Sequence, residues 1–522
     1  MISRLKQWFS DTFQEPSPSL LRMRLGPDGN SSNPLMLQFF TWESRHDTLS
    51  WWQHLEAEIP ALAQLGFTQI WLPPPNKAAE MDGRGYDAYD LWDLGEFDQK
   101  GAVKTRWGTR EELLQACEVA KQHGIDILVD AVLNHKLGAD RTENVTAIPS
   151  NPQDRLKDAG PEGEIEAWTG FDFSGRGDKY SKLRWTQEHF TGVDWDEKTR
   201  TQGIFRLTGK GHKGWSRRVD SELGNYDYLL GIDIDHRHPA VQNDLFQWGK
   251  WILETTGATG FRLDAIKHID QKFLLRFLKA TRANSGNSNM FAVSEYWSGN
   301  LKLLLPYVRA FRGETAFFDV PLHMNFNQAS KQRSRYDLRN ILKDTLISIK
   351  PNDAVTFVDN HDTVEGQSLE SWVGSEFKIQ AYALILLRHQ GYPCVFYGDL
   401  YPNRECYNEN ISKNLTLLIE ARRMFAYGKT QDYFTDRNCI GFVREGDSTH
   451  PGCAVVISNK DDSADFVHSI RMHVGLTYGG KKFKSFMQQH GRVEIGADGW
   501  GTFSCFANHV QVWVPLGESE VV

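Results

Sequence analysis

The chain has 522 residues, and its 59 basic and 67 acidic side chains give a net charge of −8. The charges are dispersed rather than gathered in basic blocks, so we expect no nucleic-acid partner. No apolar run approaches the roughly 20 residues that a membrane span needs, which excludes a membrane protein. The length exceeds that of one ordinary domain, so two or three domains are expected.

The first 33 residues are predicted to form an N-terminal extension (1–33) tied loosely to the rest of the chain. Polar residues interrupt any apolar core of the kind that a signal peptide requires: Lys6, Gln7, Ser10 and Asp11. The six cysteines show no CxxC or Cys/His metal spacing. Both observations favour a cytoplasmic protein with reduced thiols.

Eight short apolar runs recur along the chain, and helical patterns separate them. The runs are LMLQFF (35–40), TQIWLP (68–73), DILVDAVL (126–133), GFRLD (260–264), FAVSE (291–295), AFFDV (316–320), VTFVD (355–359) and CVFYG (394–398). Helices are predicted in TREELLQACEVAKQHG (109–124) and QKFLLRFLKATRAN (271–284), where apolar residues recur at three- and four-residue spacing. Eight such units predict an α/β fold, a (β/α)₈ TIM barrel over residues 34–135 and 239–425.

Two segments depart from this alternation. Residues 136–238 are rich in Gly, Asp, Trp and Thr, have no sustained helical period, and are too long for a simple loop. They are predicted to form an inserted domain after the third strand, on the catalytic rim. Residues 426–522 contain alternating runs such as CIGFVRE and CAVVIS, which predict a C-terminal antiparallel β domain, a β-sandwich.

Carboxylates stand where several predicted barrel strands end. Asp264 ends the fourth run, Glu295 ends the fifth, and Asp362 follows the seventh, while Asn134 and His135 follow the third. In TIM barrels the chemistry lies at the carboxyl ends of the strands, so these groups should converge on one rim. Any one of them alone is more simply a solvated polar residue at a loop mouth, but the joint occurrence indicates a catalytic site.

Arg262 and Asp264 lie two positions apart in an apolar strand and should share its inward face. A neighbouring guanidinium lowers the pKa of a carboxyl group, so Asp264 is expected to remain an anion. Glu295 lies in an apolar strand beside Tyr296 and Trp297, surroundings that raise a pKa and keep a carboxylic acid protonated. The alternative is a buried ion pair that only braces the barrel.

Four segments resemble, in order and spacing, the signature regions of the α-amylase family, glycoside hydrolase family 13. They are DAVLNH (130–135), GFRLDAIKH (260–268), EYW (295–297) and FVDNHD (357–362). The stretches GYDAYDLWDLGEFDQKG (85–101), RWGTREEL (106–113), GNYDYLLGIDID (224–235) and CVFYGDLYP (394–402) are similar to liquefying bacterial α-amylases and their intracellular relatives. The resemblance covers roughly residues 35 to 515.

The resemblance implies a role for each matching residue. Asp264 is implied as the nucleophile, Glu295 as the general acid/base, and Asp362 as the carboxylate that holds the hydroxyls of the distorted sugar. The implied substrate-binding residues are Tyr86, His135, Arg262, Lys267, His268, His361 and Trp297. Paired carboxylates of this kind hydrolyse glycosides through a covalent intermediate with retained configuration, which requires a separation of about 5 to 5.5 Å.

The resemblance also implies one structural calcium site. Its ligands would be Asn134, Asp227, Asp233 and the backbone carbonyl of His268, since hard oxygen ligands suit Ca²⁺ better than a transition metal. From the residues alone, acids that merely cap loops are an equal alternative. A second calcium and sodium cluster found in the liquefying relatives is predicted to be absent, because its positions correspond here to Thr191, Ser216 and Arg237, with Asp235 retained.

The function implied by the resemblance is endo-acting hydrolysis of internal α-1,4-glucosidic bonds in starch, glycogen and malto-oligosaccharides, by a monomer with no membrane partner. Two alternatives remain open from the sequence. A glucanotransferase would pass the same covalent intermediate to a sugar hydroxyl instead of water. A catalytically silent barrel would only bind glucans, and the intact set of Asp264, Glu295 and Asp362 argues against it.

Overall fold

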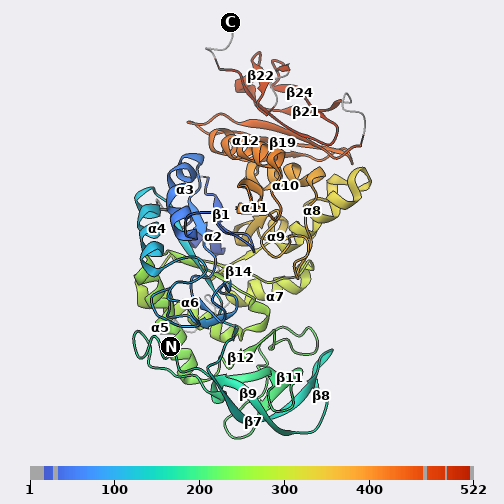
Figure 1. Ribbon diagram of the computed structural model, residues 1–522. Helices are drawn as coiled ribbons and strands as arrows, with labels where there is room; N and C mark the ends of the chain where they lie inside the picture. The colour runs from blue at the N-terminus through green and yellow to red at the C-terminus, as the bar shows by residue number, and fades with distance from the viewer. Residues whose placement is uncertain (1–16, 28–32, 462–466, 488–490, 518–522) are drawn as a thin grey trace, which may run out of the picture.

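The computed structural model describes residues 17–27, 33–461, 467–487 and 491–517. At its centre lies a closed barrel of eight parallel strands, which confirms the predicted fold class (Figure 1). In barrel order the strands are β1 (Met36–Gln38), β2 (Gln69–Trp71), β5 (Asp126–Ala131), β13 (Gly260–Leu263), β14 (Phe291–Ser294), β15 (Ala316–Phe318), β16 (Ala354–Phe357) and β17 (Tyr392–Phe396). Every strand falls within or overlaps one of the eight apolar runs.

Helices surround the barrel and bury the outer faces of its strands. They include α3 (Trp51–Leu65), α4 (Arg110–Gln122), α5 (Pro239–Thr256), α6 (Gln271–Ser285), α7 (Leu301–Phe311), α8 (Val320–Gln332), α10 (Ser375–Leu387) and α12 (Glu409–Phe425). Local chemistry sets their ends: Ser50 and Thr109 form capping boxes at the starts of α3 and α4. Gly257 ends α5 with a φ of 70°, which glycine adopts without a steric penalty.

The segment between β5 and α5 forms an antiparallel sheet, drawn at the lower end of Figure 1. Its strands run in the order β6 (His135–Lys136), β12 (Ile232–Ile234), β10 (Phe190–Asp196), β11 (Thr201–Thr208), β7 (Arg141–Asn151) and β8 (Asp154–Asp158), and β9 (Gly163–Gly170) also pairs with β7. Strand β6 follows β5 along the chain, and strand β12 is the last strand before α5. The inserted sheet therefore begins at the carboxyl ends of the barrel strands.

The C-terminal part of the chain is an antiparallel sheet packed on the barrel, drawn at the upper end of Figure 1. The six-stranded sheet has the order β18 (Thr430–Tyr433), β19 (Cys439–Arg444), β20 (Cys453–Ser458), β25 (Val510–Pro515), β22 (Lys482–Ser485) and β23 (Arg492–Glu494). Alternate residues of β19 face opposite ways: Ile440 and Phe442 join the barrel's core, whereas Cys439 and Val443 join a second core. That second core lies against a two-stranded antiparallel sheet of β21 (Val467–His473) and β24 (Trp500–Phe506).

Residues 17–27 are held firmly at the amino-terminal end of the barrel. Arg24 donates two hydrogen bonds of 2.7 Å to Asp126 at the start of β5. The amide and hydroxyl of Ser19 both donate to Asp353, just before β16. The expectation of a loosely tied extension is therefore wrong for this segment, and residues 1–16 and 28–32 lie outside the described residues. No helix among the described residues is long and apolar enough to span a membrane.

Candidate active site

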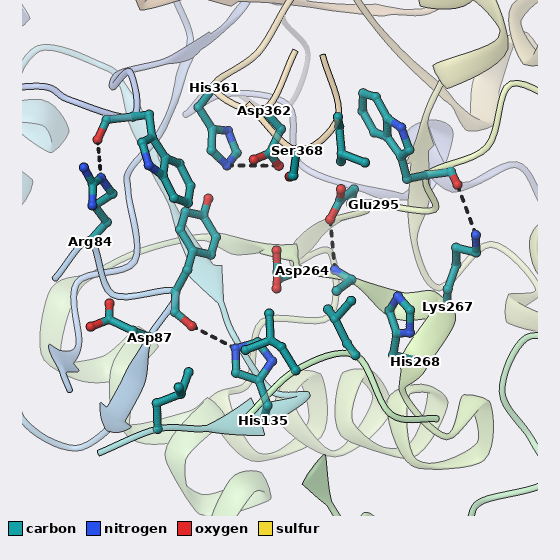
Figure 2. A pocket seen from close by; sticks show the side chains of 18 of the residues that line it. Arg84, Asp87, His135, Asp264, Lys267, His268, Glu295, His361, Asp362 and Ser368 are labelled. Carbon is teal, nitrogen blue, oxygen red and sulfur yellow. Dashed lines mark hydrogen bonds and ion pairs between the residues drawn. The ribbon is translucent and has the colours of Figure 1, made fainter. Parts of the chain in front are cut away.

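A cavity of about 830 Å³ opens at the carboxyl ends of the barrel strands. Figure 2 shows Asp264, Glu295 and Asp362 facing the same space from three different strands and loops. All predicted catalytic and substrate-binding residues except one line this cavity: Tyr86, His135, Asp264, Lys267, His268, Glu295, Trp297, His361 and Asp362. The exception is Arg262, which lies beneath it with 1% of its surface exposed.

The buried guanidinium of Arg262 joins the carboxylates under the cavity. Its Nη1 donates to Asp264 Oδ1 at 2.6 Å and to Asp130 Oδ1 at 3.0 Å, and its Nη2 donates to Glu295 Oε2 at 3.0 Å. Arg262 and Asp264 come from the end of β13 and Glu295 from the end of β14, which pair in parallel. One rigid cation thus fixes the two carboxyl groups relative to each other.

The backbone turn after β13 supplies a further contact. Ala265 has a φ of 48°, in the left-handed region that alanine seldom adopts. Its N–H donates to Glu295 Oε2 at 2.9 Å, so the unusual conformation directs a donor at the carboxyl group. Strained backbone that is maintained by its surroundings is frequent at functional sites.

The pKa values of the two central carboxyl groups are both raised. Burial raises the pKa of Asp264 to about 6, although Arg262 acts in the opposite direction. The predicted net lowering by Arg262 is therefore wrong in direction, because desolvation outweighs the guanidinium. A group with this pKa is still mainly an anion at pH 7. Burial and the charge of Asp264 raise the pKa of Glu295, as its apolar surroundings led us to expect.

Asp362 and His361 extend into the cavity from the loop after β16. His361 Nε2 lies 3.4 Å from Asp362 Oδ2, and its Nδ1 lies 3.0 Å from Gln38 Nε2 on β1. Burial lowers the pKa of His361 well below its usual value, so the imidazole is neutral. Burial and the nearby charge of Glu295 raise the pKa of Asp362 to about 8.

Aromatic rings form one wall of the cavity. Tyr86 stacks on His361 with a centroid distance of 5.2 Å and an interplanar angle of 8°, and Trp42 stacks on Tyr86 at 5.7 Å. The hydroxyl of Tyr86 donates to Asp130 Oδ2 at 2.7 Å, and His135 Nε2 donates to the Tyr86 carbonyl at 2.8 Å. These contacts hold flat apolar faces beside the carboxylates, a surface on which a sugar ring packs.

The opposite side carries Lys267, His268 and Trp297. Lys267 pairs with Glu222 from the inserted segment and donates to the Trp297 carbonyl at 3.3 Å. His268 Nδ1 donates to the Tyr226 carbonyl at 2.7 Å. Burial lowers the pKa of His268 to about 3, so this imidazole is also neutral. The inserted segment therefore closes one side of the cavity.

The predicted calcium ligands Asn134, Asp227 and Asp233 are buried between the barrel and the inserted sheet. Asn134 Oδ1 and Asp233 Oδ1 are buried oxygen atoms with no hydrogen-bond partner among the described residues. Burial raises the pKa of Asp227 to about 8, and burial together with Asp227 raises that of Asp233. Unpaired acceptor oxygens and repelling carboxylates fit a hard divalent cation.

No group of three or more His, Cys, Asp and Glu side chains suited to a metal occurs in the described ranges. The predicted calcium ligands are not such a group, because they comprise only two carboxylates together with the amide of Asn134 and the backbone carbonyl of His268. At the positions of the second cluster, Arg237 Nε donates to Asp235 Oδ1 at 2.7 Å, and its Nη1 donates to the Trp215 carbonyl. Ser216 donates to Asp270 at 2.9 Å, and Thr191 bonds Asp233.

Sequence reasoning did not predict several residues that line the cavity, among them Trp42 and Glu222. Trp42 stands two residues after the first apolar run, so the strand-end rule that led to Asp264 and Glu295 also applies to it. An indole ring carries no charge, so it stands out less at a strand end than a carboxylate does. Glu222 lies in irregular chain within the insertion, where no periodicity or strand end marks a position, and its partnership with Lys267 is visible only in three dimensions.

Comparisons with known proteins agree with this geometry. A family model described as the α-amylase catalytic domain matches residues 43–202 and 225–440. An α-amylase from Geobacillus stearothermophilus is 43% identical over 485 residues, covering 92% of this chain and 87% of that protein. A cytoplasmic α-amylase from Escherichia coli is 39% identical over 498 residues, covering 92% and 99%.

Solved structures support the fold independently. The crystal structure of an Anoxybacillus α-amylase aligns with a TM-score of 0.61 at 18% identity, covering 93% of this chain and 98% of that one. An α-amylase from Geobacillus thermoleovorans, complexed with acarbose, gives a TM-score of 0.59 at 17% identity over 93% and 98%. From the family model and the relatives of about 40% identity, the chain belongs to the α-amylase family of glycoside hydrolases.

Proposed function

We propose that the protein is an endo-acting α-amylase that hydrolyses internal α-1,4-glucosidic bonds in starch, glycogen and malto-oligosaccharides with retained configuration. The observation that carries the proposal is the shared guanidinium: Arg262 fixes Asp264 and Glu295 side by side under one cavity. Names of relatives support the substrate class, since they include α-amylases and a glucan 1,4-α-maltohexaosidase from Bacillus. We also propose that the protein acts as a monomer.

In this mechanism Asp264 attacks the anomeric carbon while Glu295 protonates the glycosidic oxygen. Asp264 has a pKa of about 6 and is mainly an anion at pH 7, and burial together with the charge of Asp264 raises the pKa of Glu295, which is the direction that a proton donor requires. Glu295 then removes a proton from water, which releases the sugar from the covalent glycosyl-enzyme. The carboxyl of Asp362 and the neutral His361 are placed to bind hydroxyl groups of the same ring.

The remaining cavity residues hold the glucan. Tyr86 presents its ring face to the sugar at the cleaved position, and His135 bonds the same ring. Lys267, His268 and Trp297 contact the leaving side. The cleft then runs between the barrel, for which we propose the limits 34–135 and 239–425, and the inserted domain at 136–238.

We further propose one calcium ion held by Asn134, Asp227, Asp233 and the backbone carbonyl of His268. When bound, it supplies charge balance for the buried carboxylates and links the insertion to the barrel. The guanidinium of Arg237 supports a single site, since it already neutralises Asp235. A cytoplasmic location is proposed from the Escherichia coli relative and from six cysteines that are all free thiols.

The proposal is tested by the Glu295→Gln variant. Removing the proton donor while keeping the shape is expected to lower turnover of soluble starch by about 10²- to 10⁴-fold with binding retained. Glu314→Gln is the matched control, because Glu314 is also a buried glutamate paired with an arginine, but lies outside the cavity. Near-normal activity of Glu295→Gln would refute the assignment.

Product analysis separates hydrolysis from transfer. Incubation with maltoheptaose is expected to give shorter chains alone, and the first products should carry the α-anomeric configuration by proton NMR. Chains longer than maltoheptaose would establish a transferase instead, and initial β-anomers would exclude the covalent intermediate at Asp264.

A further inference from the structure

The loop that carries His361 and Asp362 is held by a closed set of hydrogen bonds. Thr363 Oγ1 accepts from the Asn360 amide at 3.0 Å and donates to Asp359 Oδ1 at 2.8 Å. Asn360 Oδ1 accepts from the amides of Asp362 and Thr363 at 2.9 and 3.1 Å. The side chains of Asn360 and Thr363 thus hold this five-residue turn together, and Thr363 connects it to the carboxylate of Asp359.

Asp359 is in turn held by a lysine from a different element. Lys378, on α10, places its Nζ 2.9 Å from Asp359 Oδ2 and 2.8 Å from Asp399 Oδ1 on α11 (Tyr397–Leu400). The same Nζ lies 2.9 Å from the ring centroid of Trp372. Lys378, Asp359 and Asp399 are each only 1% exposed, so this ion pair lies in the protein interior.

Burying a lysine ammonium costs desolvation free energy, which is offset only where carboxylates pair closely with it. Here two carboxylates flank a single ammonium, and burial together with Asp399 raises the pKa of Asp359 to about 7. Tyr382 donates to Asp399 Oδ2 at 2.6 Å and supports the far side of the cluster. Without the ammonium, two buried carboxyl groups would face each other with no counter-charge between them, and Asp359 would lose its charged partner while keeping the hydrogen bond from Thr363.

We propose that Lys378 is a positioning residue for catalysis: through Asp359 and Thr363 it fixes the turn that presents Asp362 and His361 to the sugar. Its ammonium never touches the substrate. It links the outer helices α10 and α11 to the rim of the cavity, so that Asp362 is held ready before the distorted sugar forms. The inference rests on the proposed function of Asp362.

The test compares Lys378→Met with Tyr382→Phe in the full-length protein. Lys378→Met removes the charge but keeps an unbranched chain, whereas Tyr382→Phe alters the same buried cluster and leaves the link from Lys378 to Asp359 in place. With maltoheptaose, well below both melting temperatures, Lys378→Met is expected to lower kcat at least tenfold with KM changed less than threefold. Tyr382→Phe is expected to keep kcat within twofold.

A normal kcat for folded Lys378→Met, with only a lower melting temperature, would overturn the proposal. If Lys378→Met does not fold, Asp359→Asn replaces it, because the amide oxygen can still accept from Thr363 while the ion pair is lost. The same tenfold loss of kcat is then expected, and an unchanged kcat overturns the proposal. Asp362→Asn tests the proposed function separately. If this variant is fully active, Asp362 has no role in catalysis, and the proposed function fails rather than the link from Lys378.

Discussion

Two buried acidic clusters lie close together in this molecule and are balanced in opposite ways. Under the catalytic cavity, Asp130, Asp264 and Glu295 all contact one guanidinium from Arg262. At the junction with the inserted sheet, Asp227 and Asp233 contact no guanidinium from the part of the chain that the structure describes, and burial raises the pKa of both. The first cluster carries its counter-charge within the chain, whereas for the second we propose one from outside, the calcium ion.

The difference reflects what each cluster has to do. A cation built into the chain cannot leave, so it holds Asp264 and Glu295 in one geometry while protons and a sugar come and go. Two structural carboxylates can instead share an ion that binds when the insertion meets the barrel, which couples metal binding to folding. The comparison predicts that changes to the first cluster affect turnover and that changes to the second affect stability.

The largest effect is expected from Asp264→Asn. The amide keeps the shape of the side chain but cannot form the covalent intermediate, so kcat on maltoheptaose should fall by about 10⁴-fold or more. The melting temperature should be unchanged or higher, because a buried carboxylate with a raised pKa has been replaced by a neutral group. Residual activity above one-tenth of the original would show that another group attacks the sugar.

A smaller loss of activity is expected from Arg262→Met, which removes the internal counter-charge. Breaking a buried ion pair by removing one partner costs about 3–5 kcal/mol of stability. The pKa of Asp264 should rise further, and this nucleophile acts as the anion. The acid limb of kcat/KM, expected near pH 6 in the unaltered enzyme, should therefore move to higher pH. If the acid limb of kcat/KM did not move, Arg262 would have no influence on the pKa of Asp264.

Calcium removal tests the second cluster. The folded pKa of Asp227, about 8, lies above the ordinary value of 3.8. Without metal, the neutral form therefore stabilises the folded protein at low pH, and this contribution is lost as pH rises from about 4 to 8. A chelator should lower the melting temperature, and by more at pH 8 than at pH 6. At a free calcium concentration of 100 times Kd, the expected stabilisation is about 2.7 kcal/mol.

Asp233→Asn and Asp235→Asn provide the matched pair for that experiment. Asp233→Asn should abolish most of the calcium response, whereas Asp235→Asn should retain it because Asp235 is already bound by Arg237. Metal analysis of the dialysed protein should give one calcium per chain. Equal responses of the two variants would contradict the proposed ligand set.

The barrel and part of its site could be predicted from sequence, because each barrel strand is a short apolar run and several site residues stand at or just after the end of such a run. Apolar runs gave all eight strands, and polar residues at their ends gave Asp264 and Glu295. The pKa of Asp264 could not be predicted, because it depends on how desolvation compares with one ion pair. The contacts of Arg24 with Asp126 and of Lys378 with Asp359 join residues at least 19 positions apart, and no local sequence pattern records such partners.

The smallest effect is expected from Trp42→Phe, which changes the shape of the cavity wall but leaves the charges of the carboxylates unaltered. The ring of Trp42 stacks on Tyr86 and on His361, with a centroid distance of 5.7 Å in each case, and the Arg84 guanidinium lies over it. Because tryptophan is uncharged, it forms no ion pair with Asp264 or Glu295. Trp42→Phe reduces this wall by part of one aromatic contact, about 0.5–1.5 kcal/mol, which corresponds to roughly a two- to tenfold increase in KM with kcat nearly constant. Steady-state kinetics on maltoheptaose measures both. If kcat fell as far as in Arg262→Met, the stacked wall would control the geometry of the carboxylates, and the division between shape and charge in this cavity would be wrong.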